Sequence, residues 1–194
     1  MDSAIPNKSQ PRSLSAIVVM GVSGCGKSSV AEACARSLGW TLHEGDAYHS
    51  PASIAKMRAG IPLDDADRAG WLDRLAGLLS DPANRGVVLT CSALRRRYRD
   101  RLRAACPALG FVFLELDYDA ALARVQARPG HFFSPTLVAD QFATLESPRG
   151  EPAVLALDAL RPVADLAASA VEWVGVSGAH PATNPTLPVL GDAE

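Results

Sequence analysis

The most constraining feature of this sequence is a glycine-rich segment near its start, MGVSGCGKSSV, which begins at Met20. Gly21, Gly26, Lys27 and Ser28 have the G-x-x-x-x-G-K-[ST] spacing of a phosphate-binding loop. Glycine lets the backbone curl so that several N–H groups point at one anion, and a helix starting there turns its positive end to the same anion. The segment therefore predicts a site for the phosphates of a nucleoside triphosphate.

The flanking segments support this interpretation, which the short loop pattern alone would not secure. Residues 16–20, AIVVM, form a β-branched apolar run typical of a buried parallel strand. Residues 28–38, SSVAEACARSL, have apolar residues at helical spacing, and Gly39 is placed to end that helix. Strand, loop and helix thus occur in the order that phosphate binding requires.

Within the loop, Lys27 is expected to reach the outer phosphates, and the Ser28 hydroxyl is expected to ligate Mg²⁺. The residues that we expect to bind the nucleotide here are Gly21, Val22, Ser23, Gly24, Cys25, Gly26, Lys27, Ser28 and Ser29.

Beyond the loop, predicted strands and helices alternate along the chain. Further strands are predicted at 41–46, 86–93, 110–117 and 153–158, and further helices at 50–60, from Asp64 or Asp65 onward, after 95, at 119–128, 136–145 and 163–174. The third helix is expected to bury Trp71, Leu72, Leu75 and Leu78. This alternation predicts an α/β fold with a three-layer, doubly wound parallel sheet, whose ligands bind where the strands end.

The chain length of 194 residues and the hydrophobic share of 48% are typical of one domain, which we place at residues 15–174. Residues 1–14 and 175–194 are rich in Pro, Gly, Ser and Thr, so flexible ends are expected there. The formal net charge of -2 argues against nucleic acid or an acidic membrane as partner. The arginine-rich run 95–103 has two open interpretations, a solvated helix face or a phosphate-facing role.

Nothing in the sequence resembles a secretory signal or a membrane span, so a cytoplasmic location is expected. The four cysteines, Cys25, Cys34, Cys91 and Cys106, show no metal-ligand spacing and are interpreted as reduced thiols. For Cys25, a tolerated small side chain is favoured over a redox switch.

A phosphate loop suits a motor, a switch or a kinase, so other segments must distinguish them. A guanine-reading N-K-x-D is absent from the sequence. A kinase needs an acceptor pocket and a lid of arginines that neutralises the transferring phosphoryl group and excludes water.

Five segments together resemble the gluconokinases of the P-loop type, which are related to the shikimate and nucleoside monophosphate kinases. They are MGVSGCGKSSVA, EGDAYHSPASIAKMRAGIPLDDADRAGWL, CSALRRRYRDRLR, LDYDAALARVQARPGHFF and LVADQFATLESP. This resemblance implies ATP- and Mg²⁺-dependent phosphorylation of D-gluconate to 6-phospho-D-gluconate, in a homodimer. Three positions depart from the family pattern: Glu44 replaces an expected Asp, Ser50 an expected Pro, and Arg95 an expected Lys.

Chemistry and resemblance together assign roles around the acceptor. Asp46 is expected to bind acceptor hydroxyls and to take the proton of the attacking one. Glu44 is expected to hold Mg²⁺ through water, beside Ser28. His49 and Ser92 are further candidates for substrate contacts, and Arg68 for the gluconate carboxylate. Asp46 and Glu44 have the alternative of strand-end residues that bond a loop, His49 that of a packing or capping residue, and Arg68 that of a helix-start ion pair.

The lid is expected at about residues 129–136, after a helix that carries Arg124 and Arg128 on one face. Both arginines are expected to contact phosphate, and His131 to enter the site on closure. Arg161 and Pro162 are expected to line the adenine pocket. Another small-molecule kinase, specific for shikimate or a nucleoside monophosphate, and a nucleotide-dependent switch are the alternatives to a gluconokinase.

Overall fold

The computed structural model describes residues 14–127 and 135–177. Its sheet is five-stranded and parallel, with strand order β2-β3-β1-β4-β5. The strands are β1 (Ala16–Met20), β2 (Thr41–Glu44), β3 (Val87–Thr90), β4 (Leu109–Glu115) and β5 (Val154–Asp158). The predicted α/β fold is confirmed.

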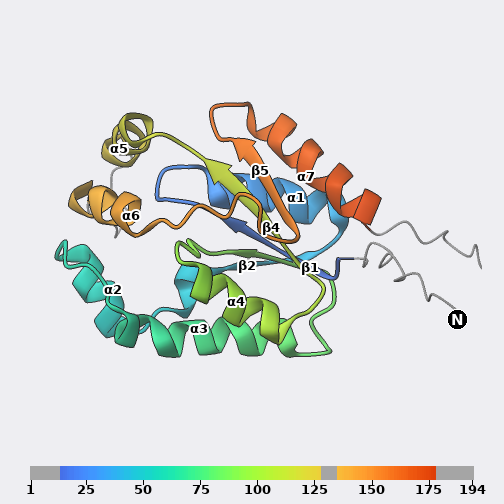
Figure 1. The fold of residues 1–194 in the computed structure, drawn as a ribbon, viewed down its shortest axis with the longest axis horizontal. Coiled ribbons are helices and arrows are strands. Elements are labelled where there is room, and N and C mark those ends of the chain that lie inside the picture. The colour runs from blue at the N-terminus through green and yellow to red at the C-terminus, as the bar shows by residue number, and fades with distance from the viewer. Residues whose placement is uncertain (1–13, 128–134, 178–194) are drawn as a thin grey trace, which may run out of the picture.

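Helices cover both faces of this sheet (Figure 1). On one face lie α1 (Lys27–Leu38) and α7 (Val163–Ser177), and on the other α3 (Asp65–Ser80) and α4 (Arg96–Ala105). The remaining helices are α2 (Pro51–Arg58), α5 (Tyr118–Gln126) and α6 (Val138–Thr144), with the 3-10 helices η1 (Gly45–Tyr48) and η2 (Pro135–Leu137). None of the helices in the described ranges is long and apolar enough to cross a membrane.

Strand β1 shows why the strands of this sheet are continuous apolar runs in the sequence. Ile17 and Val19 pack in the core under α1 and α7, whereas Val18 and Met20 pack in the core under α3 and α4. All five residues of β1 are buried, because each face of the sheet is covered.

Several sequence expectations need correction. The strands predicted at 41–46, 86–93 and 110–117 end at Glu44, Thr90 and Glu115, and Asp46 lies on η1. Gly45 makes this turn possible, since a Cβ atom there would lie 2.0 Å from the Thr90 carbonyl oxygen of β3. On α3 the buried residue is Leu79, not Leu78, which is only partly buried at the edge of the core.

Side-chain caps fix the starts of the two helices that follow η1. The Asp64 carboxylate accepts from the Asp67 N–H at 2.8 Å, and the Asp67 carboxylate accepts from the Asp64 N–H at 3.1 Å. Of the two predicted caps, Asp64 is therefore the one used. Ser50 caps α2 by accepting from the Ser53 N–H at 3.0 Å, so the departure at this position serves the helix start.

The arginine-rich run forms α4, and neither open interpretation describes it fully. Arg97 pairs with Asp65 and Arg101 with Asp73, while the fully buried Arg99 pairs with Glu151 at 2.5 Å. The run therefore docks α4 by ion pairs onto α3 and onto the segment before β5.

Candidate active site

The phosphate loop joins β1 to α1 and has the backbone that its glycines predict. Gly21, Gly24 and Gly26 have φ angles of 141°, 83° and 95°, which side chains with a Cβ rarely adopt. The Lys27 ammonium donates to the carbonyl oxygens of Gly21 at 3.2 Å and Val22 at 3.0 Å. These bonds hold the cation over the concave side of the loop.

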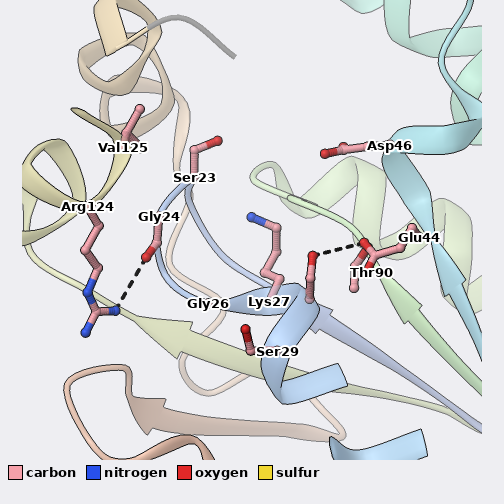
Figure 2. A pocket seen from close by; sticks show the side chains of 11 residues that line it. Ser23, Gly24, Gly26, Lys27, Ser29, Glu44, Asp46, Thr90, Arg124 and Val125 are labelled. Atoms are coloured by element: carbon pink, nitrogen blue, oxygen red, sulfur yellow. Dashed lines mark hydrogen bonds between the residues drawn. The ribbon is translucent and has the colours of Figure 1, made fainter. Parts of the chain in front are cut away.

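A cavity of about 360 Å³ opens over this loop, and we call it the loop cavity. Figure 2 shows Lys27 and Asp46 extending toward its centre from opposite sides. Its lining residues are Ser23, Gly24, Gly26, Lys27, Ser28, Ser29, Glu44, Asp46, Thr90, Arg124 and Val125.

Three oxygen-bearing side chains meet at one side of the loop cavity. The Ser28 hydroxyl donates to Glu44 Oε2 at 3.1 Å, and the Thr90 hydroxyl donates to the same oxygen at 2.7 Å. The Gly45 N–H in turn donates to Thr90 Oγ1 at 3.1 Å, which fixes the Thr90 rotamer. Hydroxyl and carboxylate oxygens are the donors that Mg²⁺ prefers, so this set fits the predicted metal site.

A metal held by protein side chains alone is not indicated. Within the part of the chain that the structure describes, no three His, Cys, Asp or Glu side chains are grouped so that they could hold an ion. Mg²⁺ bound with a nucleotide commonly takes most of its ligands from phosphate oxygens and water.

Arg124 of α5 reaches the loop cavity from the side opposite Glu44 (Figure 2). Its guanidinium donates to the Gly24 carbonyl at 3.4 Å and to the Ala159 carbonyl at 3.2 Å. These contacts tie α5 to the phosphate loop and to the turn after β5. Arg124 thus borders the loop cavity, and its contact with phosphate stays a prediction.

A second hollow, which we call the side cavity, adjoins the first. Ser23, Lys27 and Asp46 border both cavities. The other residues of the side cavity are His49, Met57, Pro62, Leu63, Arg68, Trp71, Ser92, Leu137, Asp140 and Gln141. Of the five residues predicted to contact the acceptor, Asp46, His49, Arg68 and Ser92 border the side cavity, and His131 lies outside the described residues.

His49 lies flat against Trp71, with ring centroids 4.3 Å apart and planes 12° from parallel. Trp71 is anchored in turn, because its Nε1–H donates to the Gly45 carbonyl at 2.7 Å. Burial lowers the pKa of His49, although the nearby Asp46 carboxylate opposes the shift. The ring is therefore mostly neutral at neutral pH.

Arg68 and Lys27 are the cations that line the side cavity, and the acids beside Arg68 in sequence are engaged elsewhere. Lys56 binds Asp67 at 2.6 Å, and Asp65 is bound by both Arg97 and Tyr98. Arg68 itself donates to the Leu63 carbonyl and lies over the Tyr98 ring at 5.9 Å. Among the described residues it has no carboxylate partner, so the alternative of a helix-start ion pair is not realised.

Other predicted residues stand apart from the two cavities. Arg161, in the turn after β5, donates to Ser169 Oγ at 3.2 Å, and neither it nor Pro162 borders either cavity. Their predicted role at adenine remains untested. Arg128 and His131, with most of the predicted lid, lie outside the described residues.

All four cysteines are buried and free. Burial raises the pKa of the Cys25 thiol above its ordinary value, although Lys27 and Arg124 oppose the shift. This agrees with a small packed side chain in the loop and not with a reactive thiolate.

Sequence reasoning missed several residues of the site, above all Thr90, Trp71, Asp140 and Gln141. Thr90 ends β3, so the rule that ligands bind at strand ends would have indicated it. Trp71 was predicted only as a core residue of α3. Asp140 and Gln141 lie on α6, where no local pattern distinguishes a residue that borders a site.

Comparison with known proteins adds independent findings. A family model described as an AAA domain matches residues 17–148. A gluconokinase of Gluconobacter oxydans is 46% identical over 141 residues, which cover 72% of this chain and 79% of the relative. The thermoresistant gluconokinase of Escherichia coli is 41% identical over 160 residues, covering 81% and 91%.

Solved structures agree with these sequence relatives. A gluconokinase from Sinorhizobium meliloti superimposes with a TM-score of 0.78 at 44% identity, over 86% of this chain and 95% of its own. A sugar kinase from Janibacter sp. HTCC2649 gives 0.80 at 39% identity, over 86% and 97%. A shikimate kinase from Acinetobacter baumannii, at 18% identity and a TM-score of 0.54, shares the fold alone.

Proposed function

This chain belongs to the gluconokinase family, and from that premise we propose that it transfers the γ-phosphoryl group of ATP to the 6-hydroxyl of D-gluconate. The products are ADP and 6-phospho-D-gluconate. The observation that carries the proposal is that a phosphate-loop cavity and a polar side cavity meet at Lys27 and Asp46. A donor phosphate and an acceptor hydroxyl bound in these two cavities would come together between those two side chains.

On the nucleotide side, the backbone N–H groups of the loop and the Lys27 ammonium bind the phosphates. Ser28 would hold Mg²⁺ and Glu44 would hold it through water, and the hydroxyls of Ser28 and Thr90 fix the Glu44 carboxylate. Mg²⁺ bound with ATP neutralises charge on the phosphates. Arg124 stabilises the charge of the transferring group from the opposite side.

On the acceptor side, Asp46 accepts a hydrogen bond from the attacking hydroxyl and takes its proton as the new oxygen–phosphorus bond forms. The bond between the γ-phosphorus and its bridging oxygen breaks, and ADP leaves. Lys27 borders both cavities, so its ammonium is placed to contact the transferring group.

The gluconate carboxylate binds Arg68, whose planar guanidinium suits a two-point contact with a carboxylate. His49 and Ser92 bind sugar hydroxyls, and the neutral His49 ring can donate at one nitrogen and accept at the other. His49 Nδ1 is buried without a hydrogen-bond partner among the described residues.

Several finer assignments belong to the same proposal and rest on the resemblance. Arg128 and His131 contact phosphate and acceptor from the lid, Arg161 and Pro162 line the adenine pocket, and the protein acts as a homodimer in the cytoplasm. Light scattering of the purified protein measures the dimer directly.

The function is tested by measuring ADP release with ATP and Mg²⁺ across a panel of acceptors. We expect gluconate to stimulate release by at least about a hundredfold, because chemistry requires an oriented acceptor. The panel includes shikimate and nucleoside monophosphates, the acceptors of the alternative kinases. Stimulation by one of these instead, or equal release with and without any acceptor, as a switch would give, contradicts the proposal.

A further inference from the structure

One hydrogen bond joins α6 to the phosphate loop. The Ser23 N–H donates to Gln141 Oε1 at 2.6 Å, across 118 positions of sequence. A backbone N–H can only donate, so the oxygen of the Gln141 amide must face the loop. The orientation of the amide is thereby fixed.

The nitrogen of the same amide, Nε2, is still available as a hydrogen-bond donor. Gln141 is 9% exposed and borders the side cavity, and no hydrogen bond of its Nε2 is found among the described residues. Nε2 is not one of the fully buried, unpartnered side-chain atoms of the described residues, so it is open to the cavity and can donate there to a ligand.

The neighbouring side chains suggest what that ligand is. Asp46 and Asp140, which border the same cavity, are carboxylates that only accept hydrogen bonds. A hydroxyl of a polyol both donates and accepts, so adjacent hydroxyls can satisfy a carboxylate and an amide N–H together. A chain of hydroxyls therefore suits this wall of the cavity better than an apolar or fully anionic ligand.

We propose that Gln141 is a specificity-determining and positioning residue of the acceptor site. Its Nε2 donates to one hydroxyl of gluconate, while its Oε1 holds Ser23 of the phosphate loop. The acceptor is thus aligned against the loop that carries the phosphates. This inference rests on the proposed function, since it takes gluconate as the acceptor.

Two variants separate the two halves of the amide. Gln141→Glu keeps an oxygen for the Ser23 N–H and removes the donor to substrate. Gln141→Met has a similar length and removes both. Gln126→Glu, an exposed glutamine of α5 that borders neither cavity, makes the same chemical change as a control.

The measurement is kcat and KM for ATP and for gluconate, together with a set of gluconates that each lack one hydroxyl. We expect Gln141→Glu to raise the KM for gluconate about tenfold to a hundredfold, with the KM for ATP changed less than about threefold. Gln141→Met should also lower kcat, because the loop loses its tie. Gln126→Glu should match the wild type.

The deoxygluconates separate the effect of the lost N–H donor from the effect of the charge that glutamate adds. Added charge weakens every analogue alike, whereas a lost hydrogen bond matters only where its hydroxyl is present. We therefore expect one deoxygluconate for which the extra loss in Gln141→Glu disappears. A uniform loss across the series, or an unchanged KM for gluconate, would overturn the proposal.

The outcomes also separate this inference from the proposed function. A wild-type enzyme without gluconate-dependent ADP release refutes both, whereas an active wild type with an unaffected Gln141→Glu variant refutes only the inference. Thermal unfolding of each variant confirms the folded state. If Gln141→Met unfolds, the near-isosteric Gln141→Glu carries the test alone.

Discussion

At the scale of single residues, Asp46 is the carboxylate that the two cavities share among the residues that the structure describes. It lies on η1 directly after β2 and borders both cavities, facing Lys27 across the loop cavity (Figure 2). A carboxylate in this place can orient a hydroxyl and accept its proton without touching the loop that binds the nucleotide.

Replacing Asp46 by Asn keeps the size and removes the charge and the basicity. We expect kcat with gluconate to fall about a hundredfold to ten thousandfold, the range typical of a lost general base, and the Kd for ATP to change less than about threefold. A coupled assay and an ATP titration on one preparation measure both. Near-normal turnover, or ATP binding that collapses with activity, would assign Asp46 to the metal or the fold.

Arg68 allows a second prediction, because no carboxylate of the described residues forms an ion pair with its guanidinium. Arg68→Gln should raise the KM for gluconate about tenfold to a hundredfold, since the substrate carboxylate loses a charge-assisted pair. Arg68→Lys should recover only part of this, because an ammonium lacks the planar fork. Arg85→Gln, an exposed arginine before β3 that borders neither cavity, is the control.

Turnover of the uncharged polyol D-glucitol tests whether Arg68 binds the substrate carboxylate. Any weak turnover of D-glucitol should be the same in the wild type and in Arg68→Gln. An equal loss with both acceptors would mean that Arg68 shapes the cavity and does not bind the carboxylate.

At the scale of elements, the site depends on how closely η1 packs against β3. Gly45 lies against the Thr90 carbonyl, its own carbonyl accepts from Trp71, and its N–H donates to Thr90. Three elements, η1, β3 and α3, are thus joined at one residue without a side chain. This junction places Asp46 and fixes the Glu44 carboxylate.

We expect Gly45→Ala to disturb the junction, because the new Cβ would lie 2.0 Å from a backbone oxygen. The free energy of unfolding should fall by about 1–3 kcal/mol or more, and kcat should fall with it. Gly77→Ala is the matched control, since a Cβ at that site in α3 meets no atom within 4 Å. Gly77→Ala should leave the free energy of unfolding unchanged or raise it by about 0.5–1 kcal/mol. Urea unfolding of both variants measures the difference, and equal stability would contradict the packing argument.

At the scale of the whole molecule, two partly buried histidines make global stability depend on pH. Burial lowers the pKa of His49 and of His43 from the ordinary value of 6.5. The unfolded chain then binds more protons than the folded one below that pH, so stability falls as the pH decreases. Carboxylates with lowered pKa values, such as Asp65 and Glu115, lose their contribution only at lower pH still.

We therefore expect the free energy of unfolding to decrease between about pH 7 and pH 5, and His49→Gln to flatten that slope. His49→Gln will lower stability overall, because the ring stacked on Trp71 is lost, but the slope is the quantity that tests titration. Urea unfolding at several pH values measures the slope of the free energy of unfolding against pH. A slope that is unchanged in the variant would show that His49 does not titrate in this window.

The sequence by itself determined the phosphate loop and the alternation of strands and helices, and with the family segments it indicated candidate acceptor residues. These features are local: glycine conformations, apolar runs and helix caps act over a few neighbours, so the order of residues encodes them. The predicted Asp46, His49, Arg68 and Ser92 accordingly meet in one cavity.

Only the tertiary structure decided how distant segments complete the site. The end of β2 at Glu44 depends on the approach of β3 to Gly45, and the burial of Leu79 depends on how α3 meets the sheet. Thr90 and Gln141 lie at the site because the fold brings Thr90 to Glu44 and Gln141 to Ser23. Such contacts join residues far apart in the chain, and their geometry is set by packing that no local pattern records.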